Sequence, residues 1–170
     1  MFFAVILIAI FTCLILLSWI WPPDSPWSPR WRTSRKTAKA AFKLANLKRD
    51  ETVYELGSGE AIALMVAVEE FGAKGVGVEI EPFRFALSSL SIRRRGLGGK
   101  VKLVRGNMFD VDLSSADVVY VYLVTKALTR LAPKFKKELR KGTRVVSYKY
   151  KFDLPVKKED KENELRLYVI

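Results

Sequence analysis

Strand-like runs alternate with helical stretches through most of the chain, and this alternation constrains the fold more than any other feature. The runs are rich in valine, leucine and tyrosine and are almost continuously apolar. Strands of this kind, separated by helices, are typical of a parallel sheet covered on both faces. We therefore predict a Rossmann-like, doubly wound and mostly parallel α/β sheet. The predicted strands are residues 53–56, 74–80, 100–106, 116–124, 142–152 and 165–170.

Capping residues and prolines mark the predicted helices. One helix is predicted from Ser34 onward, and another over residues 61–71, closed by Gly72. A third begins at Pro82, since proline favours the first turn of a helix. After the fourth predicted strand we expect a pair of helices broken at Pro133, because an internal proline removes a helical hydrogen bond.

The first 21 residues form an apolar run that differs from the rest of the chain. No ionisable side chain precedes Asp24, and a helix of about 20 apolar residues can cross a bilayer. The proline- and tryptophan-rich flank does not resemble the small-residue cleavage site of a signal peptide. We therefore predict a transmembrane helix at residues 1–21, a Pro/Arg-rich juxtamembrane linker at 22–33 and one domain at 34–170.

Basic residues follow the apolar run directly, in a chain whose net charge is +12. By the positive-inside rule this places the domain on the cytoplasmic side of a membrane. The lack of an Arg- and Ser-rich presequence favours a prokaryotic plasma membrane over the mitochondrial inner membrane. The same cations would attract anionic lipid or nucleic acid, and their position beside the predicted span favours lipid. They are Arg30, Arg32, Arg35, Lys36, Lys39, Lys43, Lys48 and Arg49.

Two residue types that carry much enzyme chemistry are scarce here. The chain has no histidine, and its one cysteine, Cys13, lies in the apolar run. A Ser-His-Asp hydrolase, an HExxH protease and a thiolate zinc cluster are therefore excluded. We predict no metal.

The glycine turn in "VYELGSGEA", residues 53–61, points to a nucleotide-like ligand. Gly57 and Gly59 follow the first predicted strand and precede a helix, where free N–H groups and a close backbone approach suit such a ligand. Glu79 ends the second strand, 20 residues after Gly59, where an acid accepts hydrogen bonds from ribose hydroxyls. Asn107 and Met108 follow the third strand and suit an adenine edge.

The turn does not fit a dinucleotide, because the third glycine of G-x-G-x-x-G is replaced by Ile62. It reads E-x-G-x-G-x-A from Glu55 and resembles motif I of the class I S-adenosylmethionine-dependent methyltransferases. Together with "GVEIEP", "RGNMFDVDLSSADVVYVYL" and "GTRVVSY", it is similar to the small membrane-anchored protein-lysine methyltransferases. Those enzymes act on the c-ring protein of mitochondrial ATP synthase and on the adenine nucleotide translocator, and they have prokaryotic relatives.

The resemblance implies a class I methyltransferase fold with a truncated C-terminal end, and S-adenosylmethionine as cofactor. The Glu60-Ala61 pair and Asn107 depart from the family pattern, which could narrow the turn and weaken adenine recognition. The segment "RTSRK", residues 32–36, is placed to close over the cofactor. By position, the implied contacts are Glu55, Gly57, Ser58 and Gly59 for the methionine half, Glu79 for the ribose, Ile80 against the adenine, and Asn107 with Met108 at its edge.

The acceptor side of this fold is the end of the fourth strand, where Tyr122 is placed to line a slot. We expect lysine of a membrane-associated protein as acceptor. Nucleic acid is disfavoured, because the Asn/Asp-Pro-Pro-aromatic motif and a cytosolic cysteine are both missing. Two alternatives stay open: another acceptor, such as RNA, lipid or a small molecule, or a non-catalytic membrane-tethered module that retains the fold.

Overall fold

The computed structural model describes residues 2–20 and 32–170, and its centre is a seven-stranded sheet. The strand order is β3-β2-β1-β4-β5-β7-β6; β3, β2, β1, β4 and β5 are parallel, whereas β7 runs antiparallel to β5 and to β6. The predicted mostly parallel sheet is confirmed. The strands are β1 (Thr52–Leu56), β2 (Lys74–Glu79), β3 (Val101–Arg105), β4 (Val118–Val121), β5 (Arg144–Tyr148), β6 (Lys158–Asp160) and β7 (Leu165–Val169).

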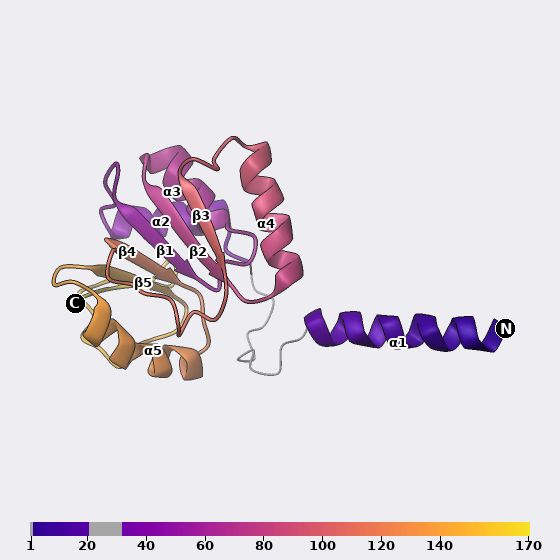
Figure 1. The fold of residues 1–170 in the computed structure, drawn as a ribbon. Coiled ribbons are helices and arrows are strands. Elements are labelled where there is room, and N and C mark those ends of the chain that lie inside the picture. Colours follow the sequence, from indigo (N-terminus) through magenta and orange to yellow (C-terminus); the bar gives the residue numbers. More distant parts are fainter. Residues whose placement is uncertain (1, 21–31) are drawn as a thin grey trace.

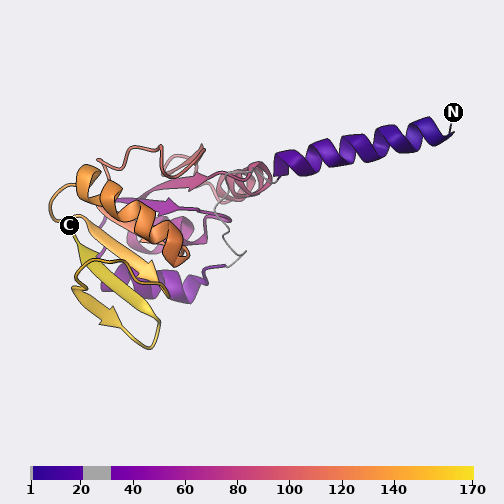
Figure 2. The same ribbon diagram turned by 90° about the horizontal axis from the view of Figure 1, so that it is seen from below.

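Helices cover both faces of the sheet, as the alternation predicts. α2 (Arg35–Leu44), α3 (Ile62–Phe71) and α4 (Pro82–Arg94) contribute to a core on one face, and α5 (Thr125–Glu138) lies on the other. Figures 1 and 2 show α5 and α2 on opposite sides of the strands. Ser34 caps α2 by accepting a hydrogen bond from the Thr37 N–H at 3.0 Å, and Glu81 caps α4 in front of Pro82.

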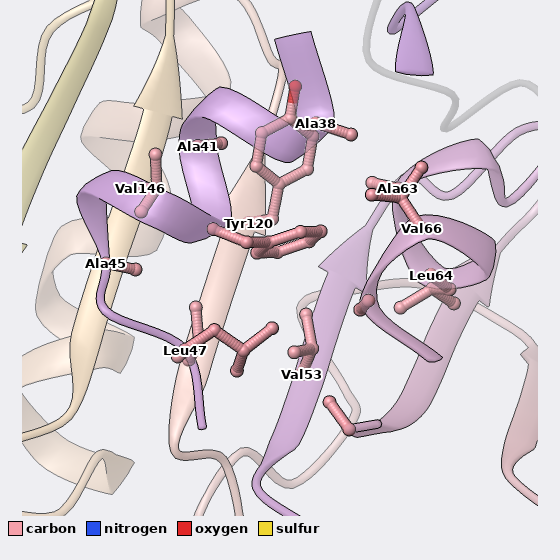
Figure 3. Close-up of a cluster of buried hydrophobic side chains, with 14 of the residues drawn as sticks. Ala38, Ala41, Ala45, Leu47, Val53, Ala63, Leu64, Val66, Tyr120 and Val146 are labelled. Atoms are coloured by element: carbon pink, nitrogen blue, oxygen red, sulfur yellow. The ribbon is translucent and has the colours of Figure 1, made fainter. Parts of the chain in front are cut away.

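The core on the α2 face is built around a buried tyrosine. Tyr120 of β4 is 1% exposed and lies below Ala38 and Ala41 of α2 (Figure 3). Its ring centroid is 6.0 Å from that of Phe42. The small alanines let α2 approach β4 and β5 closely, so the helix fixes the carboxyl end of β4, where the acceptor side is expected.

Pro133 does not break the helix that follows β4, so the prediction of a helical pair is wrong. α5 runs without interruption from Thr125 to Glu138 with Pro133 inside it. Leu128, Leu131 and Phe135 of this helix are fully buried against the sheet. Burial of this apolar face on both sides of the proline compensates for the hydrogen bond that the proline removes.

The predicted transmembrane helix is also wrong. α1 (Phe2–Ile20) forms where the apolar run predicts a helix, and Figure 1 shows it extending away from the sheet. Its 19 residues span about 28 Å at ~1.5 Å per residue, less than the ~30 Å hydrocarbon core of a bilayer. Across the described residues, no helix combines the length and apolarity that crossing a membrane requires. The predicted orientation in a membrane depended on that span.

The predicted linker at residues 22–33 lies outside the described residues, apart from Arg32 and Thr33. The edge strand β6 had no counterpart in the sequence prediction. Its residues, Lys-Glu-Asp, have low strand propensity, and they form a strand because β7 offers its free backbone edge to them.

Candidate functional site

The glycine turn between β1 and α3 is held against the end of β2. The N–H groups of Gly57 and Ser58 both donate to the Val78 carbonyl at 2.9 Å. Gly57 and Gly59 have φ angles of 74° and 51°, and Ala61 has a φ of 57°. A left-handed conformation is open to glycine but costs alanine roughly 1 kcal/mol. Ala61 therefore keeps the shape of the turn at a small energetic cost.

Gly77 on β2 lies directly behind this turn, where no larger residue fits. A Cβ at Gly77 would lie 2.6 Å from Leu103 Cδ2, 2.8 Å from Leu64 Cδ1 and 2.9 Å from Ser58 Oγ. Gly77→Ala is therefore expected to lower the free energy of unfolding by about 1–3 kcal/mol, as measured by urea denaturation. Gly75→Ala is the matched control, because its nearest atom is at 3.2 Å. The prediction fails if the two variants are equally stable.

Glu79 joins the glycine turn to the end of β2. Its Oε2 accepts the Gly59 N–H at 2.7 Å, and its Oε1 accepts the Glu81 N–H at 2.9 Å. The side chain is buried. Since each carboxylate oxygen can accept two hydrogen bonds, both oxygens retain capacity for a ribose hydroxyl. The structure thus brings Glu79 and Gly59 together, as their spacing in the sequence predicts.

Glu55 is a buried carboxyl group beside the turn with incomplete hydrogen bonding. The residue is 5% exposed, and its Oε2 has no hydrogen-bond partner among the described residues. Burial raises the pKa of Glu55 to about 8; the Leu64 N–H opposes this shift and the charge of Glu79 adds to it. Ser58 Oγ is likewise buried without a partner in the described part of the chain. Buried polar groups are normally paired, so both atoms fit a polar, cationic ligand at this turn.

The residues predicted for the adenine lie at the ends of β2 and β3, with different surroundings. Ile80 is half-buried. Asn107 Oδ1 accepts the Phe109 N–H at 3.1 Å and so shapes the turn after β3. Met108 is buried in the α5-side core with Val78, not on the face that carries Glu55 and Glu79. Their contacts with adenine stay predictions.

The acceptor side contains an aromatic pair of which sequence reasoning identified one member. Tyr122 follows β4, and the parallel register of β4 with β5 aligns Val121 with Ser147. This register places Tyr148 beside Tyr122, with ring centroids 4.4 Å apart. Tyr148 also ends a predicted strand, and the adjacency of the fourth and fifth strands in the sheet is the signal that could have revealed it.

The segment before α2 contacts both the glycine turn and β4. Thr33 Oγ1 and the Tyr120 hydroxyl are 3.1 Å apart in a buried hydrogen bond. Arg32 forms an ion pair with Glu60 of the turn. Burial also raises the pKa of Tyr120, so its hydroxyl stays protonated and available as a donor. These contacts place residues 32–34 where closure over a cofactor was predicted, and that closure stays a prediction.

Comparison with known proteins identifies relatives with methyltransferase descriptions. Residues 55–160 match the family described as the ANTKMT methyltransferase domain. A protein-lysine N-methyltransferase of Saccharolobus islandicus is 37% identical over 129 residues, which are 75% of this chain and 78% of that protein. A Caenorhabditis elegans lysine N-methyltransferase, named for its action on the c-ring protein of ATP synthase, is 26% identical, over 74% of this chain and 66% of that protein.

A solved structure shares the fold over most of both chains. It is an RNA methyltransferase from Salinibacter ruber in complex with S-adenosyl-L-homocysteine, with a TM-score of 0.79 and 27% sequence identity. The superposition covers 82% of this chain and 94% of the other. Its ligand differs from S-adenosylmethionine only in lacking the transferable methyl group, and the glycine turn, Glu55 and Glu79 are the groups that fit such a ligand here.

Proposed function

Because this chain belongs to the ANTKMT methyltransferase domain family of S-adenosylmethionine-dependent enzymes, we propose that it methylates lysine side chains of a protein. The Saccharolobus relative, a protein-lysine N-methyltransferase by name, matches three quarters or more of both chains and supports this acceptor class. In the structure, the observation that carries the proposal is the buried, incompletely paired Glu55 beside the glycine turn. A carboxyl group in that position suits a cationic cofactor and would repel a pyrophosphate.

S-adenosylmethionine supplies an electrophilic methyl group on a sulfonium, and the residues of this chain position the reactants. Glu79 holds the ribose through its two carboxylate oxygens, while Glu55 and Ser58 face the methionine half. Arg32, Thr33 and the rings of Tyr122 and Tyr148 restrict water around the acceptor. Such positioning and desolvation are the main contributions that a protein can make to this displacement.

The acceptor amine must lose a proton before it can attack the methyl carbon. A lysine with a reference pKa of ~10.4 requires roughly 4–5 kcal/mol to become neutral at pH 7. An apolar slot next to a second positive charge disfavours the ammonium and lowers that cost. The aromatic surface of Tyr122 and Tyr148, beside the place of the sulfonium, provides both conditions.

The test is product analysis. The full chain is incubated with methyl-labelled S-adenosylmethionine and, in separate reactions, with poly-L-lysine, with total RNA and with lipid vesicles. We expect methyl-lysine after acid hydrolysis of poly-L-lysine, identified by mass spectrometry. Poly-L-lysine whose amines are already fully methylated is the control and should take up no label. Label confined to RNA or lipid, or cofactor binding without any transfer, would contradict the proposal.

RNA is the second candidate acceptor, because a specific observation favours it. The net charge of +12 suits a polyanion, and the Salinibacter structure carries the name RNA methyltransferase. The RNA reaction of the same experiment separates the two candidates.

A further inference from the structure

We propose that Tyr122 and Tyr148 form the subsite for the acceptor lysine and that Lys149 occupies this subsite until a substrate lysine displaces it. The inference rests on the proposed function, since it specifies how that site recognises its substrate. In this arrangement Lys149 acts as an internal pseudosubstrate, and the side chain that competes with it is a lysine of the substrate protein.

Lys149 lies against both rings of the aromatic pair. Its Nζ is 5.8 Å from the ring centroid of Tyr122 and 5.5 Å from that of Tyr148. The two rings are 4.4 Å apart and inclined at 55°. Both distances fall within the ~6 Å over which an aromatic ring attracts a cation. The pair therefore forms a cation-binding surface, and the cation that it holds in this structure is the side chain of a lysine.

The subsite lies at the same edge of the sheet as the glycine turn. β1 and β4 pair so that Leu56 is level with Val121, and the next residues, Gly57 and Tyr122, leave their strands side by side. Leu123 Cδ2 would lie 3.3 Å from a Cβ on Gly57, which confirms that the end of β4 packs on the turn. A cation on the aromatic pair is thus next to the turn that would hold the cofactor.

The backbone at Lys149 has a conformation that a lysine rarely adopts. Its φ is +65°, and the Tyr150 N–H donates to the Tyr148 carbonyl at 2.8 Å. This i to i+2 hydrogen bond with a positive central φ describes the rarer, strained form of γ-turn. Strained conformations of this kind persist where the surroundings impose them, and they are concentrated at functional sites.

Neighbouring groups hold this turn in place. The Lys149 N–H donates to the Glu164 carbonyl at 2.8 Å, and the Lys149 carbonyl accepts from Arg166 Nη1 at 2.8 Å. Ser147 Oγ donates to the Tyr150 carbonyl at 2.6 Å. The turn therefore directs the Lys149 side chain back over the aromatic pair, whereas an extended continuation of β5 would direct it to the opposite face.

The charge state of Lys149 distinguishes a pseudosubstrate from an acceptor. Its hydrogen bond with the Tyr122 hydroxyl, followed by the charge interactions with Tyr122 and Tyr148, raises the pKa of Lys149. An ammonium has no lone pair and cannot attack a methyl group. Lys149 is thus held as a cation in the subsite, while a substrate lysine must still lose its proton there. Competition between the two lysines is expected to raise the KM for the substrate.

The test compares charge-neutral and charge-retaining variants of the full chain. Lys149→Gln keeps a long side chain at the same backbone conformation but removes the charge, and Lys149→Arg keeps the charge. With poly-L-lysine as the probe, Lys149→Gln is expected to lower KM by about 3- to 10-fold with kcat within about two-fold, because more of the subsite is vacant. Lys149→Arg is expected to resemble the wild type. Lys141→Gln, an exposed lysine at the other end of β5, is the matched control.

Three further measurements keep the outcomes distinguishable. Calorimetry should give the same S-adenosylhomocysteine affinity for the wild type and Lys149→Gln, because the cofactor lies outside the subsite. Tyr148→Leu in the Lys149→Gln background should raise KM again, since one aromatic wall is lost. Methylation of Lys149 itself, detected by peptide mass spectrometry, or an unchanged KM in an active Lys149→Gln protein would overturn the inference. A wild type that binds cofactor but never methylates poly-L-lysine would instead overturn the proposed function.

Discussion

Glu79→Ala is expected to weaken S-adenosylmethionine binding by about 100-fold or more, because the carboxylate contributes two charge-assisted hydrogen bonds worth ~1.5–3 kcal/mol each. The effect on the cofactor is also indirect. Glu79 accepts the Gly59 N–H and the Glu81 N–H, so alanine removes an anchor of the glycine turn together with the ribose contact. Isothermal titration calorimetry with S-adenosylmethionine and S-adenosylhomocysteine measures the loss.

Glu81→Ala is the matched control for Glu79→Ala. Glu81 lies two residues further on and also accepts two backbone N–H groups, those of Phe83 and Arg84, at 2.8 Å. Its loss removes an N-cap worth ~0.5–2 kcal/mol of stability but no ligand contact. Glu79→Gln serves as a second variant that keeps the shape of the side chain. Equal loss of cofactor affinity in Glu81→Ala and Glu79→Ala would show that the effect is structural and would contradict the ribose role.

The stability of the protein is expected to fall as pH rises from about 4.5 to about 8, and Glu55→Gln is expected to remove this fall. In the unfolded chain Glu55 ionises near its ordinary value of 4.5, whereas in the folded protein burial holds its pKa at about 8. Between these values the folded state binds one proton more, so stability declines with pH. The loss contributed by this group is on the order of 4 kcal/mol.

Urea denaturation between pH 5 and pH 9 tests this dependence. Glu55→Gln should give a flatter pH profile and should exceed the wild type in stability above pH 8. Glu162→Gln, at an exposed glutamate, is the control and should retain the wild-type slope. Cofactor affinity should move in the opposite direction, rising with pH in the wild type, because a cationic ligand favours the ionised carboxylate. Parallel stability profiles for Glu55→Gln and the wild type would contradict the assignment.

Much of the fold was predictable because its signals are local or depend on a regular period. Apolar strand runs alternating with helices predicted the parallel sheet, and Ser34 and Pro82 predicted two helix starts. The glycine turn and Glu79 were predictable as a pair for a topological reason. Consecutive parallel strands end at the same edge of a sheet, so residues at successive strand ends meet there, and the Gly59 hydrogen bond to Glu79 is the result.

The tertiary structure decided what no local signal contains. Pro133 sits inside a helix because burial on both sides of it holds α5 against the sheet. Tyr148 and Lys149 join Tyr122 only through the β4–β5 register and a γ-turn whose energy is set by partners distant in sequence. Sequence patterns therefore determined the sheet and one half of the site, since these depend on residue types at regular spacing. The acceptor half depends on which strands become neighbours and on how a strained turn is held, and long-range packing determines both.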